Sequence, residues 1–248
     1  MRIKWLGHAS VLITSDAGIK IITDPYEPGY HSAPRGTLAY GDIKELADIV
    51  AVTHEHGDHN NVAAVSGNPE IVRGSEIRGA GVVKVKGIDF KAVPCHHDGV
   101  GGGLLGENNM LCFEVDGLRI CHNGDLGHQL SDEQVAELGK IDILLLCVGQ
   151  LVPVGEPQFT VNDAGRRVRF WSQYTINADV ANQLYDQLAP KVIIPIHYSN
   201  DKCSFKLVGV DEFLKGKKNV VRMDTSEVEF TRERLPADTQ IIVVAPAL

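Results

Sequence analysis

Four side chains of the types that bind metal ions stand within six consecutive positions of this chain. His54, His56, Asp58 and His59 form the pattern H-x-H-x-D-H, directly after the apolar run DIVAVT. Imidazole and carboxylate groups suit zinc and other first-row divalent ions. In a tight loop, the first two histidines can face one ion while the other pair faces a second. The pattern predicts a metal site rather than a solvated polar loop.

Two metal ions need more ligands than one loop offers, so we expect partners at the ends of other strands. Three further apolar runs lead directly into ligand-type residues: 90–94 into Cys95-His96-His97-Asp98, 118–122 into Asn123-Gly124-Asp125, and 191–196 into His197-Tyr198. If these strands end at one edge of the sheets, all of these segments converge on the H-x-H-x-D-H loop.

Short apolar runs separated by turns dominate the first half of the chain, and helix–strand units follow in the second half. A helix is expected from Ser131, with Gln134 three residues later as in a capping box. A second helix is expected from Asn177 or Asp179 to about Leu188, before a proline. Strands are expected at residues 2–6, 10–14, 19–23, 48–53, 70–73, 82–85, 89–93, 110–115, 118–122, 142–148, 191–196, 220–223 and 241–244. Two sheets with helices outside would bury these runs, which predicts an α/β protein.

Composition argues against several classes of protein. The chain has 248 residues and a net charge of −8, unlike a general binder of nucleic acids. Its first residues do not resemble a secretory signal, and its longest aliphatic run, Ile143–Val148, is far shorter than a membrane span. The five cysteines form no C-x-x-C pair. Four are therefore expected to be buried thiols in a reducing cytoplasm, with Cys95 set apart by its neighbouring histidines.

The order of these motifs resembles the metallo-β-lactamase superfamily. The resemblance runs from WLGHASVLI to PIHY, and it is closest to a branch of uncharacterised metal-dependent hydrolases similar to L-ascorbate-6-phosphate lactonase, through TDPYEPG, DGLRICHNGDLGH and YTINADVANQLYDQLAPKVIIPIHY. It implies a four-layer αββα sandwich with two mixed β-sheets and helices outside. Residues 1–248 would form a single domain with an insertion at about 150–175.

The resemblance also implies how the ligands divide between two divalent ions, with zinc preferred and manganese as the alternative. His54, His56 and His97 would hold the first ion, Asp58, His59 and His197 the second, and Asp125 would bridge them. His97 is chosen over His96 because the histidine of the family precedes an acidic residue. His96 and Cys95 are then expected to be packing or supporting groups.

Two adjacent ions would make a metal-bound hydroxide available near neutral pH and stabilise the charge that develops as it attacks. This predicts hydrolysis of a small ester, lactone or phosphodiester, with Asp58 as the catalytic residue that orients the nucleophile or carries its proton. His122 is expected to be structural and His31 solvated. Four more residues are candidates for supporting the ligands or contacting the substrate, each against a structural role: His8, Asp24, His128 and Tyr198.

The segment 150–175 departs from the resemblance, with Gln150 where a glycine is expected. Arg166, Arg167 and Arg169 in this insertion could bind an anionic small-molecule substrate. A solvated hairpin or a contact in a homo-oligomer is the favoured alternative for them. No membrane partner is expected.

Three other functions compete with the hydrolase prediction. A nuclease on the same fold is disfavoured by the acidic balance of the chain. A di-iron redox protein is disfavoured because no dinucleotide-binding fingerprint accompanies the motif. A metal-binding protein without catalysis is disfavoured because the ligand set is intact.

Overall fold

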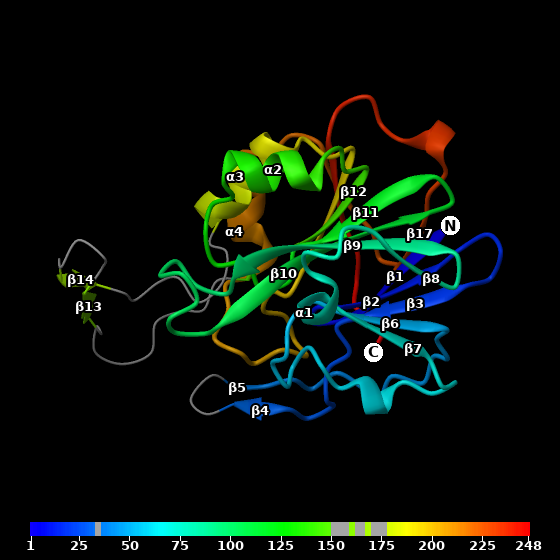
Figure 1. The fold of residues 1–248 in the computed structure, drawn as a ribbon, viewed down its shortest axis with the longest axis horizontal. Coiled ribbons are helices and arrows are strands. Elements are labelled where there is room, and N and C mark those ends of the chain that lie inside the picture. The colour runs from blue at the N-terminus through cyan, green and yellow to red at the C-terminus, as the bar shows by residue number, and fades with distance from the viewer. Residues whose placement is uncertain (33–35, 150–158, 162–166, 170–177) are drawn as a thin grey trace.

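Two β-sheets packed face to face form the body of the protein (Figure 1). The computed structural model describes residues 1–32, 36–149, 159–161, 167–169 and 178–248. The first sheet has six strands in the order β17-β1-β2-β3-β6-β7. Their bounds are β1 (Arg2–Gly7), β2 (Ser10–Thr14), β3 (Lys20–Thr23), β6 (Ile49–Val52), β7 (Glu70–Arg73) and β17 (Glu227–Glu229).

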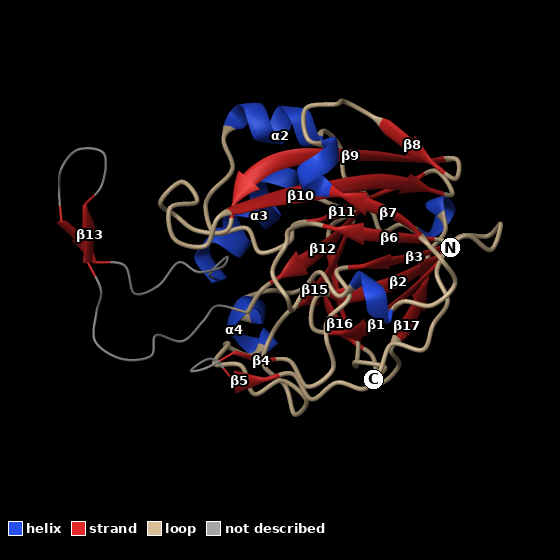
Figure 2. Ribbon diagram, turned by 60° about the horizontal axis from the view of Figure 1, so that its bottom comes forward, coloured by secondary structure: helices blue, strands red, loops and turns tan. Residues whose placement is uncertain are grey.

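The second sheet has eight strands in the order β16-β18-β15-β12-β11-β10-β9-β8. Their bounds are β8 (Val83–Val85), β9 (Ile88–His96), β10 (Glu107–Val115), β11 (Leu118–His122), β12 (Ile143–Cys147), β15 (Val192–Ile196), β16 (Val220–Arg222) and β18 (Gln240–Val243). Figure 2 shows these strands beside the first sheet, with the helices at the periphery.

Four short α-helices, two small strand pairs and two 3-10 helices, η1 (Val62–Ala64) and η2 (Arg232–Arg234), complete the described structure. The α-helices are α1 (Gly74–Ile77), α2 (Asp132–Leu138), α3 (Ala178–Leu188) and α4 (Val210–Leu214). The small pairs are β4 (His31–Ser32) with β5 (Gly36–Thr37), and β13 (Phe159–Val161) with β14 (Arg167–Arg169). None of the described helices is long and apolar enough to cross a lipid bilayer.

The central strands β2, β3 and β6 of the first sheet are buried on both faces, which explains their continuous apolar runs. In β6, Ile49 and Ala51 join the core between the sheets, whereas Val50 and Val52 join a second cluster on the opposite face. Loop residues complete that second cluster, among them Tyr26, Leu38, Tyr40, Ile43 and Phe205. The predicted α/β class with two mixed sheets is confirmed, and much of the cover on this side comes from loops.

The strands that carry the candidate ligands run in the same sense within each sheet. In the first sheet, β1 and β3 are both antiparallel to β2, and β3 is parallel to β6. In the second, β9 and β11 are both antiparallel to β10, and β11, β12 and β15 are parallel in succession. Their carboxyl ends therefore lie at one edge of each sheet, where ligands commonly bind in α/β proteins.

Most of the predicted helices and strands are present, but their first or last residues differ from the predicted ones. The capping box of α2 is present, since Ser131 Oγ accepts from Gln134 N at 3.2 Å and Gln134 Oε1 accepts from Ser131 N at 3.0 Å. Strand β9 is longer than expected and continues through Pro94 to His96. Cys95, which we set apart from the other thiols, lies inside this strand, and all five cysteines are free and buried.

Candidate metal centre

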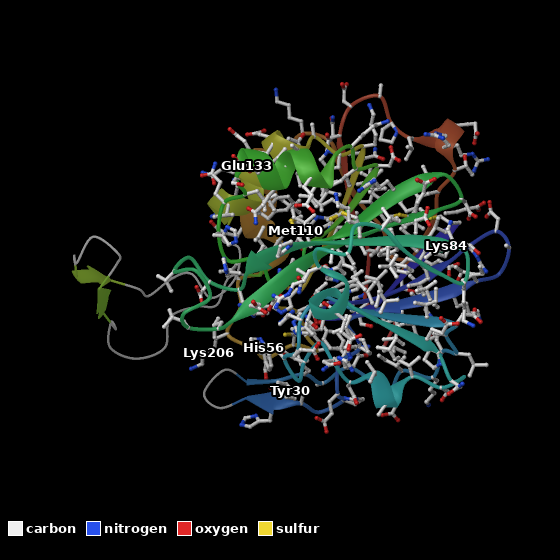
Figure 3. All side chains as sticks on the ribbon, in the orientation of Figure 1. Tyr30, His56, Lys84, Met110, Glu133 and Lys206 are labelled. Carbon is white, nitrogen blue, oxygen red and sulfur yellow. The ribbon has the colours of Figure 1, made fainter. Side chains whose placement is uncertain are left out.

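Ligand-type side chains from several strand ends gather into two adjoining sets. The ligand atoms within each set lie within 4.8 Å of one another, and the sets are His54, His56 and His97, and His8, Asp58, His59 and His197. The sets are neighbours, because the ring centroids of His54 and His59 are 4.3 Å apart. The ring of Tyr30 packs over Gly57, beside the first set. Figure 3 labels Tyr30 close to His56, which belongs to that set.

Asp125 lies between the two sets. Its Oδ2 is 3.1 Å from Nε2 of His97, in the first set. The same oxygen is 3.4 Å from Nε2 of His59 and 3.4 Å from Nε2 of His197, both in the second set. The loop after β11 therefore carries one carboxylate oxygen that faces both groups of histidines.

Several buried atoms of this cluster have no hydrogen-bond partner in the described structure. They include Nε2 of His54, His59 and His197, and Oδ1 of Asp125. Orphaned buried polar atoms are rare, and a group of them points to an ion or ligand. All of these atoms are donors of electron pairs that suit divalent cations, so the residues present fit a metal centre.

Two histidines of the cluster are held neutral, and the carboxylate of Asp125 is held ionised. Burial lowers the pKa of His54 well below its usual value and that of His197 to about 3, which keeps both rings neutral. Burial alone would raise the pKa of Asp125, but the histidines around it outweigh burial and hold that pKa well below its usual range. Neutral imidazole and ionised carboxylate are the forms that bind metals.

Asp24, at the end of β3, fixes the orientation of His59. Its Oδ2 lies 3.0 Å from Nδ1 of His59. A carboxylate only accepts hydrogen bonds, so Nδ1 carries a proton, and in the neutral ring that binds a metal Nε2 is left with the free electron pair. A carboxylate behind a ligating histidine is a common support in metal sites. Asp24 was a candidate for supporting a ligand or contacting the substrate, and the structure places its carboxylate against His59.

Thr53 extends this support to His54. Its hydroxyl donates to Asp24 Oδ2 at 2.6 Å and its backbone N–H donates to Asp24 Oδ1 at 2.8 Å. The hydroxyl oxygen then accepts from Nδ1 of His54 at 3.0 Å, which leaves Nε2 of His54 without a proton. One buried carboxylate thus sets the tautomer of a histidine in each set.

The backbone at the site is held in unusual conformations. His8, Asp24 and His197 have φ angles of 50°, 37° and 54°, which L-residues with side chains rarely adopt. Such strain persists where the surrounding structure enforces it, and it is concentrated at functional sites. A Cβ added to Gly149 would lie 2.1 Å from the carbonyl oxygen of His197, so the chain after β12 must pass close to this turn.

The remaining predicted residues lie in different surroundings. His8 Nε2 is 3.3 Å from Asp58 Oδ2, as expected for a residue that supports a ligand. His128 does not join either set, because its Nε2 accepts from the backbone N–H of His96 at 3.0 Å. Tyr198 turns away from its neighbour His197 and packs its ring 5.1 Å from that of Trp5, so it is a core residue here.

Two histidines were expected to have no part in the chemistry. His122 is buried, and its Nε2 donates to the carbonyl oxygen of Ala9 at 2.9 Å, which ties β11 to the first sheet. His31 is exposed and contacts Thr37. The side chains of Arg166, Arg167 and Arg169 lie outside the described residues, as does most of the segment 150–175.

Sequence reasoning missed three buried asparagines that hold the site loops. Asn108 Oδ1 accepts from the backbone N–H of Asp125 at 3.2 Å. Asn109 Nδ2 donates to the carbonyl oxygen of Thr53 at 2.9 Å, and Asn123 Oδ1 accepts from the backbone N–H of Cys147 at 2.8 Å. The sequence signal that could have identified two of them is the adjacent pair Asn108-Asn109 at the start of a long apolar strand.

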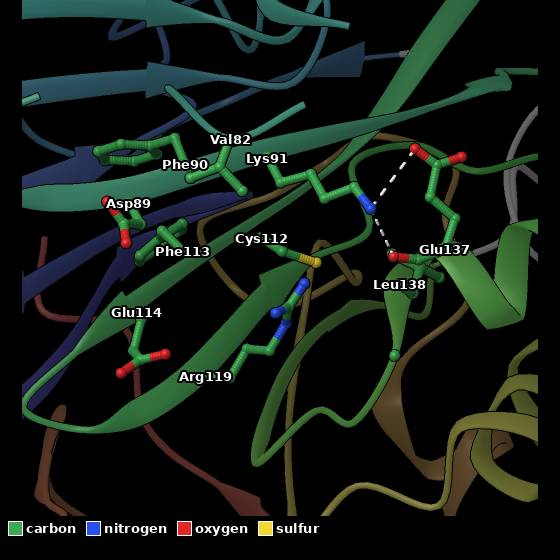
Figure 4. Close-up of a pocket in the computed structure, with 11 residues that line it drawn as sticks. Val82, Asp89, Phe90, Lys91, Cys112, Phe113, Glu114, Arg119, Glu137 and Leu138 are labelled. Carbon is green, nitrogen blue, oxygen red and sulfur yellow. Dashed lines mark hydrogen bonds and ion pairs between the residues drawn. The ribbon is translucent and has the colours of Figure 1, made fainter. Parts of the chain in front are cut away.

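A cavity of about 270 Å³ lies far from this cluster (Figure 4). It is lined by residues from the amino ends of β9 and β11 and from the end of α2, including Asp89, Arg119 and Leu138. Lys91 at its rim donates to the carbonyl oxygen of Glu137 at 2.8 Å. The candidate ligands stand at the opposite ends of these strands.

Known proteins resemble this chain along most of its length. The sequence pattern of the β-lactamase superfamily domain matches residues 2–197. A UPF0173 metal-dependent hydrolase of Thermus thermophilus is 29% identical over 221 residues, which cover 80% of this chain and 84% of that protein. A solved structure from Thermotoga maritima, described there as a proposed Zn-dependent hydrolase of the metallo-β-lactamase superfamily, is 30% identical with a TM-score of 0.68 and covers 98% of this chain and 97% of its own.

The same fold also occurs in a more distant protein. CmlA, a diiron β-hydroxylase from Streptomyces venezuelae, is 14% identical with a TM-score of 0.55, covering 82% of this chain and 46% of that one. At this identity the comparison concerns the fold alone. The domain match, in contrast, includes every residue of the two sets. This chain therefore belongs to the β-lactamase superfamily.

Proposed function

We propose that this chain is a hydrolase that binds two divalent ions and cleaves a small ester, lactone or phosphodiester. It is a metal-dependent hydrolase of the class to which its named relatives belong. The observation that carries the two-ion proposal is the position of Asp125, whose Oδ2 faces His97 on one side and His59 and His197 on the other. A carboxylate placed in this way can bridge two ions.

The proposed ligands are the members of the two sets other than His8, which contacts Asp58, together with Asp125. His54, His56 and His97 hold the first ion, Asp58, His59 and His197 hold the second, and Asp125 bridges them. The first site offers nitrogen ligands, which suit zinc, and manganese is the alternative. When bound, the two ions activate water and polarise the bond to be cleaved.

Asp58 orients the attacking water in this proposal. Burial alone would raise its pKa, but His59 and the hydrogen bond from His8 hold that pKa well below its usual range. A carboxylate that stays ionised readily accepts a hydrogen bond from water. Because it is a weak base, it does not retain the proton that the water loses. Asp24 and Thr53 keep the ligand nitrogens aimed at the ions throughout.

The chain is also proposed to act as one domain with a small-molecule substrate. Ligands from residue 54 to residue 197 meet at one cluster, which supports a single functional unit. Five free, buried cysteines support a reducing compartment, the cytoplasm. The predicted similarity to ascorbate-6-phosphate lactonase places a lactone among the first substrates to test.

Metal loading and a substrate panel test this proposal. Protein purified with zinc or manganese is expected to hold two ions per chain by elemental analysis, and a His54→Ala variant is expected to hold fewer. Both forms are then assayed with γ-butyrolactone, p-nitrophenyl acetate, bis-p-nitrophenyl phosphate and a short RNA. One ion or fewer per chain would contradict the two-ion proposal. Faster RNA cleavage than small-ester hydrolysis would favour a nuclease, and oxygen uptake by iron-loaded protein would favour redox chemistry.

A further inference from the structure

Two thiols face each other across neighbouring strands of the second sheet. Strands β10 and β11 are antiparallel, and Cys112 lies directly opposite Cys121 in their register. On its other side Cys112 lies opposite Lys91 of β9. Residues opposite each other in a sheet share a face. Here Cys112 and Lys91 are on the face that lines the cavity of about 270 Å³ beside the end of α2 (Figure 4).

The turn that joins β10 to β11 fixes how close the two thiols are. Both residues of the turn at 116–117 have positive φ angles, 51° and 72°, as in a two-residue type I′ hairpin. Val115 and Leu118, which flank such a turn, form a hydrogen-bonded pair, and the two kinds of pair then alternate along the strands. Cys112 and Cys121 are therefore a non-hydrogen-bonded pair. Its α-carbons lie about 4.5 Å apart, within the roughly 4.4–6.8 Å that a disulfide spans.

The contacts of the two sulfur atoms make the thiols unequal. The Cys121 thiol donates a hydrogen bond to the sulfur of Cys112, and the guanidinium of Arg119 lies against that same sulfur (Figure 4). The hydrogen bond from Cys121, together with Arg119 and Lys91, outweighs burial and lowers the pKa of Cys112. Burial raises the pKa of Cys121 well above its usual value. The thiolate is the nucleophilic form of cysteine, so Cys112 is the more reactive of the two.

The cavity gives a small oxidant a route to Cys112. Cys112, but not Cys121, is among the described residues that line it. Cys112 is only 1% exposed, so a reagent must be small to reach its sulfur. Hydrogen peroxide is little larger than water and carries no charge, so the acidic residues of the cavity, Asp89, Glu114 and Glu137, do not repel it. Cys112 is therefore the thiol that meets the oxidant.

We infer that hydrogen peroxide joins Cys112 and Cys121 in a reversible disulfide across β10 and β11. The Cys112 thiolate attacks one oxygen of the peroxide, the O–O bond breaks, and a sulfenic acid and hydroxide form. The hydroxide takes the proton of the Cys121 thiol and becomes water. The Cys121 thiolate then attacks the sulfenic sulfur, so the S–S bond forms as the S–O bond breaks.

The atoms and electrons of this sequence balance. The second hydroxide leaves as water with the proton that the Cys112 thiol first released. Two thiols have then lost two electrons and two protons, and one peroxide molecule has become two molecules of water. A dithiol such as dithiothreitol reverses the reaction by two thiol–disulfide exchanges and is itself oxidised. This redox site is separate from the proposed hydrolase activity and needs no metal ion.

Peptide mapping of peroxide-treated protein tests the inference. The folded full-length protein is treated with hydrogen peroxide, quenched with catalase, alkylated with iodoacetamide in denaturant and digested. Mass spectrometry is expected to find the peptides of Cys112 and Cys121 joined, and dithiothreitol is expected to separate them. Cys112→Ala is expected to leave Cys121 reduced. Cys203→Ala, at a buried thiol of the second cluster on the other side of the first sheet, is expected to keep the disulfide.

Two further variants test the order of the steps. In Cys121→Ala the sulfenic acid has no partner, so labelling of Cys112 by dimedone is expected to rise about tenfold over the unchanged protein. Arg119→Gln is expected to slow the oxidation about three- to tenfold, because it removes a charge that favours the thiolate. Arg2→Gln, at an exposed arginine of the first sheet, is expected to leave the rate unchanged.

The unchanged protein can overturn the inference without any variant. It fails if the folded chain forms no disulfide between Cys112 and Cys121 while the chain unfolded in urea is oxidised, or if either thiol pairs faster with another cysteine. Oxidation of Cys121 in Cys112→Ala at the rate of the unchanged protein would also overturn it. Because the readout is a covalent bond, loss of the proposed hydrolase activity would not imitate any of these results.

Discussion

The Asp24 carboxylate lies 3.0 Å from Nδ1 of His59 and directs the opposite ring nitrogen into the cluster. Asp24→Asn presents an amide that can turn its N–H groups toward the ring and release the tautomer of His59. We expect this variant to bind zinc about 10- to 100-fold more weakly, as measured by competition with a chelating dye. Asp238→Asn, at an exposed carboxylate, serves as the control. Unchanged zinc affinity in Asp24→Asn would contradict this role.

Thr53 passes the same support to His54 through its hydroxyl. Thr53→Val keeps the shape of the side chain and removes both hydrogen bonds, so zinc occupancy should fall about tenfold or more. Thr53→Ser restores the hydroxyl and should recover most of the affinity. Equal losses in the valine and serine variants would show that packing, not the hydroxyl, matters.

Asp58 has two tasks in the proposed mechanism, as a ligand and as the acceptor that orients water. We expect Asp58→Asn to lower kcat by about 100-fold or more, since a neutral amide ligates and accepts more weakly. Metal content, measured on the same sample, shows how much of the loss comes from an empty second site. Full activity with normal metal content would remove Asp58 from the mechanism.

Gly124 stands in the turn that presents Asp125. At φ +54°, an added Cβ would lie 2.2 Å from Asn108 Oδ1 and 2.8 Å from Thr53 Oγ1. Gly124→Ala should therefore lower the free energy of unfolding by about 2–4 kcal/mol through overpacking and strain. Gly139→Ala is the matched control, because Gly139 has a similar φ of +65° and no atom within 4 Å of the added Cβ. Equal losses in urea denaturation would refute the close approach at Gly124.

Asp98 closes the loop that follows His97. Its two oxygens accept backbone N–H bonds from Val100, Gly102, Leu104 and Leu105 at 2.8–2.9 Å. Burial alone would raise the pKa of Asp98, but these four bonds lower it. A carboxyl group with a lowered folded-state pKa stabilises the fold above its unfolded pKa of about 3.9, and this contribution is lost as the pH falls through the folded value.

Asp98→Asn should therefore cost about 1–3 kcal/mol of unfolding free energy at pH 7, because the amide accepts fewer of these bonds. The difference between the two proteins should shrink as the pH falls below about 4. Guanidinium denaturation at both pH values measures this directly. A difference that stays constant or grows in acid would show that the lowered pKa is not the cause.

Neighbouring residues at strand ends show how far the sequence could lead. His197 and Tyr198 are consecutive, yet His197 joins the cluster while Tyr198 packs on Trp5. His197 follows the end of β15 and has a φ of 54°, so the backbone turns at this residue and the two side chains point in different directions. The residue types in the sequence favoured His197 as a metal ligand. The position of the Tyr198 side chain, in contrast, depended on which side of the chain faces the core.

The sequence by itself determined the fold class and which residues are the candidate ligands. The motif H-x-H-x-D-H is local, and apolar runs ending in His97, Asp125 and His197 mark strand ends whatever the sheet order. The tertiary structure alone decided which groups support and surround these ligands. Asp24 meets His59 across 35 residues of sequence, and Asn109 meets Thr53 across 56. Such contacts arise from the pairing of strands and the packing of two sheets, and no local pattern of residues encodes them.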